Sequence, residues 1–389
     1  ISETTAIGLP QINLAAGYQY YFDVPTSLVP AEFFGGDPGD FLEIQFGTEQ
    51  SLTASANISQ LIFSGEYIVG LRAARIYREL ASQEVIRSEL EVRSLVSESY
   101  YMVLMLEESL RIMKQNQQNL NRSYQETLAI LEQGLTDPIN ADQLRLSLIN
   151  MQHRISGLAR QHKVSSHLLK FQIGIDMDTE IILSESLAEL FNQLSMSALT
   201  EHSFDPQAHI EARIMDTRER FGLMALRREQ SQFLPSLNAS FVRQEMAMRN
   251  QFDFLKSGQP WFPTTFFGIN LNIPVFSSGM RAARVSQARL ELEKIKLGRE
   301  QVNQSVKLAM LQDRSSMQTA LEQYQQQQEN LDLAKRIWER TQIMHREGMA
   351  SSLELTQASD QYLATQALWL ESMFDVLSAR EQIQKASGR

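Results

Sequence analysis

The side chains that could do chemistry are scattered along this chain and do not form a known catalytic motif. The six histidines lie between His153 and His345, and none belongs to a His-Glu-x-x-His pair or another close set of metal ligands. Cysteine is absent, so thiolate metal sites and disulfides are excluded. There is no glycine-rich phosphate loop and no nucleophile elbow. The sequence therefore predicts no catalytic, metal or cofactor site, and we do not expect an enzyme.

Two further residue groups favour structural roles. The 16 methionines carry soft thioethers, which suit Cu(I). However, Met102, Met113 and Met317 lie on or beside apolar helix faces, where methionine packs well. The segment 35–40 is rich in glycine and aspartate but lacks the ligand spacing of an EF-hand loop, so we expect an exposed turn.

Acidic side chains near helix starts are the remaining candidates. Glu354 follows Ser351 by three residues at the start of a helical pattern, which is the spacing of a capping box. Capping alone explains Glu354, and it is compatible with a second role. Asp142 and Asp360 are expected to be solvated residues on helix faces.

These acids lie near the ends of a long helical segment that occurs twice. The first copy runs without proline from Gly65 to Gly134, and the second from Gly279 to Gly348, each glycine pair being 69 residues apart. A helix over 66–133 would be about 100 Å long. Apolar residues at steps of three and four predict a buried seam in each copy. The seams comprise Val103, Leu106, Leu110, Met113, Leu120, Tyr124 and Leu131, and Met317, Leu321, Tyr324, Leu331, Ala334, Trp338 and Met344.

Each long helix ends at a glycine suited to a left-handed C-cap and is followed by a new helix start. Asp137 and Pro138 fit the N-cap and first position of one returning helix, and Ser351 fits the N-cap of the other, which we expect to run to about Ala386. The sequence therefore predicts two long helical hairpins with tight tips at 134–138 and 348–352.

Alternating sequence precedes each long helix and predicts two β-hairpins. Strands are expected around 12–22, 51–59, 237–241 and 267–273, each with one apolar face and one face rich in Asn, Ser, Thr or Gln. The stretches between them, 24–44 and 249–262, are expected to be long loops. The aromatic residues Tyr20, Tyr21, Phe22, Phe266 and Phe267 are expected at strand ends, where an interfacial girdle would lie.

Four such strands need an unusual setting, because nothing else in the chain supplies a second sheet to cover their apolar face. In a membrane barrel that face meets lipid and the polar face lines water. Since the smallest membrane barrels have about eight strands, several chains would have to share one barrel, with eight strands from two chains or twelve from three. Because each long helix starts directly after a strand, a helical tube would continue the barrel.

Bulk properties agree with this setting. The net charge of −10 and the lack of a basic run argue against nucleic-acid binding. No window of about 18 apolar residues predicts a transmembrane helix.

The ordered set of motifs resembles the TolC-type outer membrane efflux proteins, the outer membrane factors. The Leu-Pro strand starts (Leu9-Pro10 and Leu234-Pro235), the strand-to-helix turns (58–65 and 273–279) and the tips (134–144 and 348–358) carry the likeness. The helix from Asp205-Pro206 to Gln232 is similar to the family's helix that ends in Leu-Pro.

The resemblance implies an α+β membrane protein in which long α-helical hairpins form an α-barrel and two β-hairpins give four strands to a trimeric twelve-stranded β-barrel. It implies an exit duct of a tripartite efflux pump or type I secretion system in the outer membrane, with its helices in the periplasm. The expected partners are two further copies, a periplasmic adaptor (membrane fusion protein), an inner-membrane RND or ABC transporter, and outer-membrane lipid. The alternative is a soluble periplasmic coiled-coil scaffold or adaptor, which would need no detergent.

The resemblance also assigns candidate sites. Adaptor contact falls on the tip residues Gly134, Leu135, Thr136, Gly348, Met349, Ala350 and Ser351. Glu354 is the main candidate for a pore constriction, and Asp142 and Asp360 are weaker ones. Ala350 stands where some members carry a latch arginine, and Asn140 stands where Glu354 falls in the other repeat, so any acidic ring comes from one repeat.

The expected domain division follows the repeat. It comprises a first β-hairpin (9–65), a first helical hairpin (66–172), an equatorial layer with a short β-like run at 181–183 (173–205), a helix (206–232), a second β-hairpin (233–279) and a second helical hairpin (280–389). The first repeat lacks a counterpart of most of helix 206–232, so we expect residues 1–11 to be the end of a longer segment.

Overall fold

The computed structural model describes residues 1–193 and 205–388 and divides into two compact units. Unit 1 comprises Ile1–Ala81 and Thr217–Leu297, and unit 2 comprises Ser82–Asp216 and Gly298–Arg389. The division falls within three helices that run through both units. These are α2 (Gly65–Glu132), α6 (Ile210–Ser231) and α7 (Met280–Arg346).

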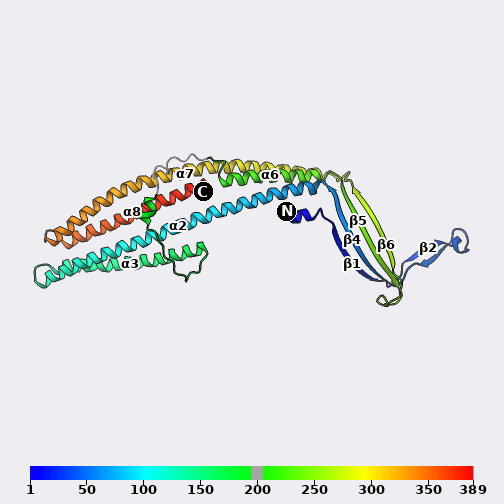
Figure 1. The fold of residues 1–389 in the computed structure, drawn as a ribbon, viewed down its shortest axis with the longest axis horizontal. Helices are drawn as coiled ribbons and strands as arrows, with labels where there is room; N and C mark the ends of the chain where they lie inside the picture. The colour runs from blue at the N-terminus through cyan, green and yellow to red at the C-terminus, as the bar shows by residue number, and fades with distance from the viewer. Residues whose placement is uncertain (194–204, 389) are drawn as a thin grey trace. The chain divides into compact units, whose positions relative to one another are not determined.

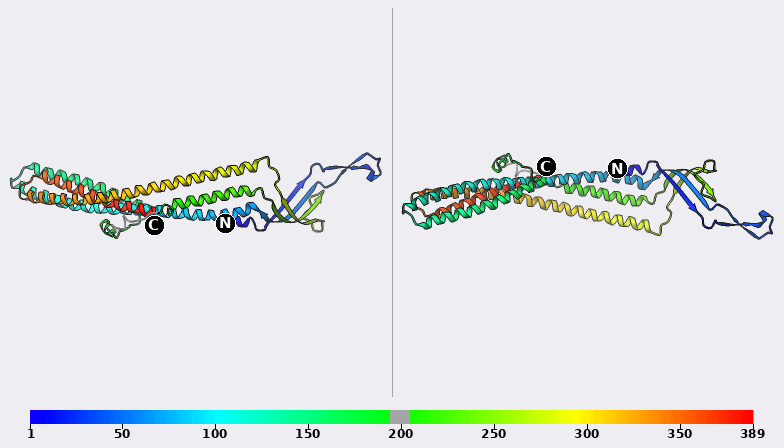
Figure 2. Two further views of the ribbon diagram at one scale, coloured as in Figure 1. Left: turned by 90° about the horizontal axis from the view of Figure 1, so that it is seen from above. Right: turned by 90° about the horizontal axis from the view of Figure 1, so that it is seen from below.

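Unit 1 is built around a four-stranded antiparallel sheet with the order β1-β4-β5-β6 (Figures 1 and 2). The strands β1 and β6 are therefore the edges of the sheet. The sequence predicted all four strands, and β4 and β5 extend further than the alternating runs. Their bounds are β1 (Gln11–Tyr20), β4 (Gln50–Ser64), β5 (Ser236–Arg249) and β6 (Phe262–Asn272).

One face of the sheet is apolar and open, as the alternation predicts. Ile12 pairs with Ile58, which pairs with Phe241, so the three side chains share this face. Ile12 is 68% exposed and Phe241 43%. The same face also carries an ion pair of 2.6 Å between Arg243 and Glu245, which an apolar face would not predict.

Two predictions about the strands are wrong. The segment 24–44 is not a plain loop, because β2 (Thr26–Pro30) pairs with β3 (Phe41–Gln45) and the short helix η1 (Ala31–Phe34) follows β2. Its glycines mark the turn between two strands; Gly35, for example, has φ +84°. In addition, Phe266 and Phe267 lie in the middle of β6, not at its end.

Unit 2 holds the returning helices α3 (Pro138–Ile173) and α8 (Ser352–Ala386), each antiparallel to the helix before it (Figure 1). Many of the predicted seam residues are buried, including Val103, Leu106 and Met317 at 3% exposure or less. Two apolar clusters form. The cluster nearer the tips includes Leu120, Leu144, Met151, Ile155, Leu355 and Leu363, and the other joins α2, α4, α7 and α8.

The segment after α3 differs from its prediction. Residues 181–183 are not a strand, and the short helix α4 (Leu187–Asn192) follows them. Leu187 and Phe191 of α4 are buried, so this helix is anchored in the core although its sequence shows little periodicity. The predicted layer 173–205 falls partly outside the described residues. Helix α6 starts at Ile210, not at Pro206, because 206–208 form a turn.

Residues before the first strand contain a short helix, α1 (Ser2–Ala6). In the described part of the chain, no helix combines the length and apolarity that crossing a membrane requires.

Candidate functional site

The tip of the first helical hairpin is closed by a left-handed glycine and an aspartate cap. Gly134 has φ +73°, and its N–H donates to the Leu131 carbonyl over 2.8 Å. The Asp137 side chain then accepts a hydrogen bond of 2.9 Å from the Ile139 N–H. The sequence predicted both devices. Of the tip residues, Leu135 is 73% exposed, so the apex presents an apolar side chain to solvent.

The tip of the second hairpin has the same left-handed glycine, and its helix start has a reciprocal cap. Gly348 has φ +72°, and the Met349 N–H donates to the Met344 carbonyl over 2.8 Å. The Glu354 N–H donates to Ser351 Oγ over 3.2 Å, while the Ser351 N–H donates to Glu354 Oε2 over 2.7 Å. The capping box predicted from the sequence is therefore present.

A histidine that belongs to no sequence motif lies at this second tip. His345 is half-buried, and its Nε2 lies 3.3 Å from Ser352 Oγ, whose residue is 1% exposed. Burial lowers the pKa of His345, and the carboxylate of Glu126 opposes this. No spacing motif marks His345, because its partners come from α8 and α2.

The three carboxylates proposed for a constriction have different surroundings. Glu354 is committed to the cap, and the hydrogen bond from the Ser351 N–H lowers its pKa. Asp360 lies 3.4 Å from Arg154 of α3, and both side chains are more than half exposed. Asp142 is exposed on α3. Within the described residues, no three His, Asp or Glu side chains gather in an arrangement that could hold a metal ion.

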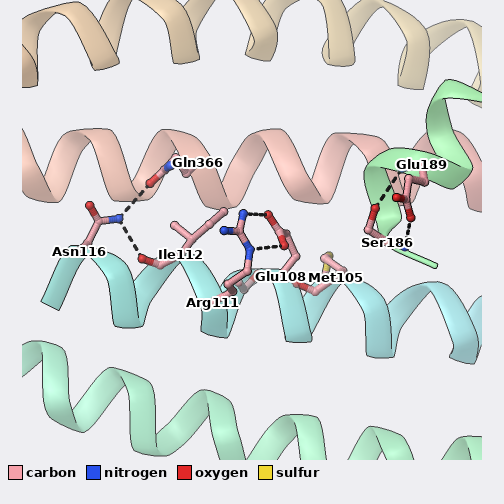
Figure 3. Close-up of polar contacts among 9 residues, drawn as sticks. Met105, Glu108, Arg111, Ile112, Asn116, Ser186, Glu189 and Gln366 are labelled. Atoms are coloured by element: carbon pink, nitrogen blue, oxygen red, sulfur yellow. Dashed lines mark hydrogen bonds and ion pairs between the residues drawn. The ribbon is translucent and has the colours of Figure 1, made fainter. Parts of the chain in front are cut away.

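Three polar contacts join α8 to the first hairpin. Farthest from the tip, the Tyr101 hydroxyl donates to Glu381 Oε1 over 2.9 Å, and each residue is 8% exposed. Further toward the tip, Asn116 Nδ2 donates to Gln366 Oε1 over 3.2 Å, as Figure 3 shows.

The third contact, between Arg154 and Asp360, is nearest to the tip and is the most exposed of the three. Burial of the cross-repeat contacts therefore decreases toward the tip. A polar contact that excludes water is stronger than one in solvent, so the weakest of these three polar contacts is the one nearest to the tip.

Helix α4 sits at the buried end of this series. The Ser186 and Glu189 side chains form a capping box at its start (Figure 3). Phe191 then packs against Tyr324 of α7, with ring centroids 4.4 Å apart. Since Leu187 and Phe191 belong to the cluster that also contains residues of α2 and α8, α4 ties both hairpins together.

Two further sites, which no sequence motif marks, lie where strands become long helices. In the second repeat, Arg281 is 6% exposed and donates to the carbonyls of Pro274 (2.7 Å) and Gln232 (3.4 Å). Its guanidinium also lies 5.0 Å from the ring centroid of Phe233.

In the first repeat, other side chains hold the junction between strand and helix. Here β4 passes directly into α2, and the Tyr67 hydroxyl donates to the Thr5 carbonyl over 3.2 Å. Gly8 leaves room for that ring, since a Cβ at Gly8 would lie 2.2 Å from the Tyr67 hydroxyl.

These features define a class of protein in which an antiparallel sheet with an open apolar face continues, twice, into a long helical hairpin. Solved structures of other proteins share this fold, and three of them are compared with this chain by TM-score, sequence identity and coverage. They are the outer membrane protein VceC from Vibrio cholerae (TM-score 0.72, 15% identity, 100% of this chain and 89% of that chain), the CmeC outer membrane channel of Campylobacter jejuni (0.71, 16%, 100% and 79%), and the MtrE outer membrane channel of Neisseria gonorrhoeae (0.73, 14%, 100% and 82%).

Sequence comparison leads to the family. The family model described as "Outer membrane efflux protein" matches residues 1–174 and 223–389. Because this match covers most of both repeats, the chain belongs to the outer membrane efflux protein family. No curated protein matches the chain in a sequence search.

Proposed function

We propose that this protein is the outer-membrane exit duct of an efflux or secretion system and that it conducts its substrate passively. The observation that carries the proposal is the family match over both repeats. The open apolar face of the sheet supports it, because strands with one apolar and one polar face suit a barrel that separates lipid from water. The direct passage from Ser64 of β4 to Gly65 of α2 would let the helices continue the duct.

The assembly we propose is a homotrimer in the outer membrane with its helices in the periplasm. The sheet leaves β1 and β6 without a second partner strand among the described residues, and open edges must close in lipid. Three copies pairing β6 with β1 would give twelve strands. An inner-membrane RND or ABC transporter would supply the energy through a periplasmic adaptor, which would contact Gly134–Thr136 and Gly348–Ser351.

Opening would begin at the tips. The polar cross-repeat contacts weaken from the buried Tyr101–Glu381 pair to the exposed Arg154–Asp360 pair. A pull from the adaptor would therefore separate the hairpins first near Gly134 and Gly348, while the α4 cluster keeps the other end together. Glu354 would line the constriction from the start of α8 and act as its cap at the same time.

Cross-linking tests this proposal directly, because the native chain has no cysteine. Leu135→Cys with Met349→Cys, joined by a bismaleimide, should link neighbouring copies and block export, while Leu135→Cys alone should export normally. A covalent link that leaves export unchanged would refute tip opening. The Val164→Cys variant, exposed on α3 away from the tip, controls for labelling itself.

Fractionation separates the channel from the soluble scaffold. We expect the channel to need detergent for extraction and to migrate as a trimer before heating. Release into buffer without detergent would favour the scaffold instead.

A further inference from the structure

The ribbon formed by residues 23–49, which contains β2, η1 and β3, exposes apolar side chains on both of its faces. Leu28 pairs with Glu43 on one face, and Val29 pairs with Leu42 on the other. Among its exposed apolar residues are Leu28 (64%), Phe33 (79%), Phe34 (62%), Phe41 (65%), Leu42 (44%) and Phe46 (61%). An isolated two-stranded hairpin is only marginally stable in water. Uncovered aromatic side chains on such a ribbon therefore indicate a contact surface.

The charge of the ribbon narrows the choice of partner. It carries six acidic residues and no basic one, and the first basic side chain of the whole chain is Arg72. An anionic surface such as phosphate-bearing lipid would repel it. The acidic residues are Asp23, Glu32, Asp37, Asp40, Glu43 and Glu49.

A second copy of this chain offers a matching surface. The loop 250–261 between β5 and β6 exposes Phe252 (66%) and Leu255 (90%) beside Lys256. In the described part of the chain, Arg243 and Arg249 have carboxylate partners, whereas Lys256 forms no ion pair. The loop therefore combines exposed apolar side chains with a lysine, Lys256, that could pair with a carboxylate of another copy.

Continuity with the sheet edges brings the two surfaces together. The ribbon follows β1, and the loop precedes β6, so both adjoin the edges of the sheet. Pairing of β6 from one copy with β1 of the next, on which this inference rests and which belongs to the proposed function, sets the loop of one copy beside the ribbon of its neighbour. Because ribbons of like charge repel one another, the loop is the better partner for each ribbon.

We propose that the ribbon of each copy packs against the 250–261 loop of the adjacent copy and fastens the assembly at this end of the sheet. Leu28 and Phe41 lie on one ribbon face and supply apolar contact, and the acidic residues receive Lys256. The occupant of the surface is thus a second copy and not lipid.

Thermal dissociation of the detergent-purified oligomer tests the inference. Replacing Leu28 and Phe41 by serine removes only exposed side chains of the single chain, so it should not harm the isolated fold. If the interface exists, the temperature of dissociation falls by about 5 °C or more. Lys256→Glu should lower it less, and only at low salt. The control is Ile182→Ser, because Ile182 is an exposed apolar residue too, at 88%, but lies in unit 2.

A second measurement identifies the partner surface. Copies carrying only Phe33→Cys are mixed during assembly with copies carrying only Leu255→Cys and treated with a bismaleimide. A linked heterodimer supports the inference, and pairing Ile182→Cys with Leu255→Cys should give none.

The outcomes separate the two proposals. If the wild type forms no oligomer, the proposed trimer fails. If the wild type is a trimer but the serine variant dissociates at the same temperature, or the cysteine copies do not link, the inference is overturned. Destabilisation that appears only in phosphate-bearing lipid vesicles would assign the ribbon to the membrane instead and overturn it as well.

Discussion

The two repeats reach the same architecture, yet their strand-to-helix junctions are held differently. Arg281 in the second repeat is buried and binds two carbonyl groups, while Tyr67 in the first is more exposed and donates a single hydrogen bond. Each junction also contains an aromatic ring, but at a different position. In the first repeat the ring belongs to Tyr67 on α2, and Gly8 leaves room for it. In the second repeat it belongs to Phe233, which precedes β5.

The repeat therefore preserves the positions of its elements but not the side-chain contacts that hold them. Gly65 is the first residue of α2 and Gly279 directly precedes α7, but only the second junction has a turn, with Ser278 at φ +49° and Gly279 at φ +81°. Such left-handed residues are costly for non-glycine side chains. The buried Arg281 compensates by anchoring that turn, and the first junction, without a turn, does not need such an anchor.

The junctions should respond unequally to substitution. Arg281→Ala removes the donor for the carbonyls of Pro274 and Gln232, and we expect a loss of about 3 kcal/mol or more in the free energy of unfolding. Tyr67→Phe removes one hydrogen bond, and we expect about 0.5–1 kcal/mol. Chemical denaturation in detergent measures both. Arg281→Lys keeps the charge but not the planar fork, so it should recover only part of the loss. Equal losses at Arg281 and Tyr67 would remove the contrast between the repeats.

The tips should respond alike, because their glycines share one conformation. A Cβ at Gly134 or Gly348 would contact no neighbouring atom, so the cost of alanine at either position comes from the left-handed backbone alone. We expect Gly134→Ala and Gly348→Ala each to lower the free energy of unfolding by about 1–2 kcal/mol. Gly157→Ala is the matched control, since Gly157 lies inside helix α3 and the change should stabilise it slightly. Unfolding of each variant by denaturant gives the comparison, and a much larger loss at one tip would indicate contacts that the other lacks.

Acid should loosen the second tip in two steps. The lowered pKa of His345 means that its neutral form suits the folded tip, so this stability is present above about pH 6.5 and is lost as the pH falls through the lowered value. The lowered pKa of Glu354 acts in the same direction below about pH 4.5. Hydrogen exchange of residues 348–354, corrected for intrinsic rates, measures both steps. His345→Asn should abolish the first and Glu354→Gln the second; an unchanged first step in His345→Asn would exclude His345.

The smallest effect on stability is expected where the repeats meet near their tips. Arg154→Ala breaks an exposed ion pair with Asp360. We expect the free energy of unfolding to fall by about 0.5 kcal/mol or less, and by a smaller amount at high salt. Its effect on function should be larger, since this contact would open first. Ion conductance across planar bilayers should rise in Arg154→Ala and return in the charge swap of Arg154→Asp with Asp360→Arg. Conductance that stays at the wild-type level would count against this contact as part of the gate.

The repeat, the four main strands, the helical hairpins and their caps could all be predicted from the sequence. These features depend on local rules: period, left-handed glycine and the spacing of Ser351 and Glu354. Sequence also pointed to the family through the order of its motifs. It failed at 24–44, where proline and glycine concealed two strands, and at 181–183, where three apolar residues were read as β-like although they form no strand.

Which side chains of different elements contact one another becomes visible only in the folded structure. His345 with Ser352, Arg154 with Asp360 and Tyr101 with Glu381 are pairs drawn from different helices. Arg281 likewise donates a hydrogen bond to the carbonyl of Gln232, which is distant in sequence. No periodic pattern records such pairs, because burial and hydrogen bonding between elements depend on how the elements pack and not on the spacing of residues within either one.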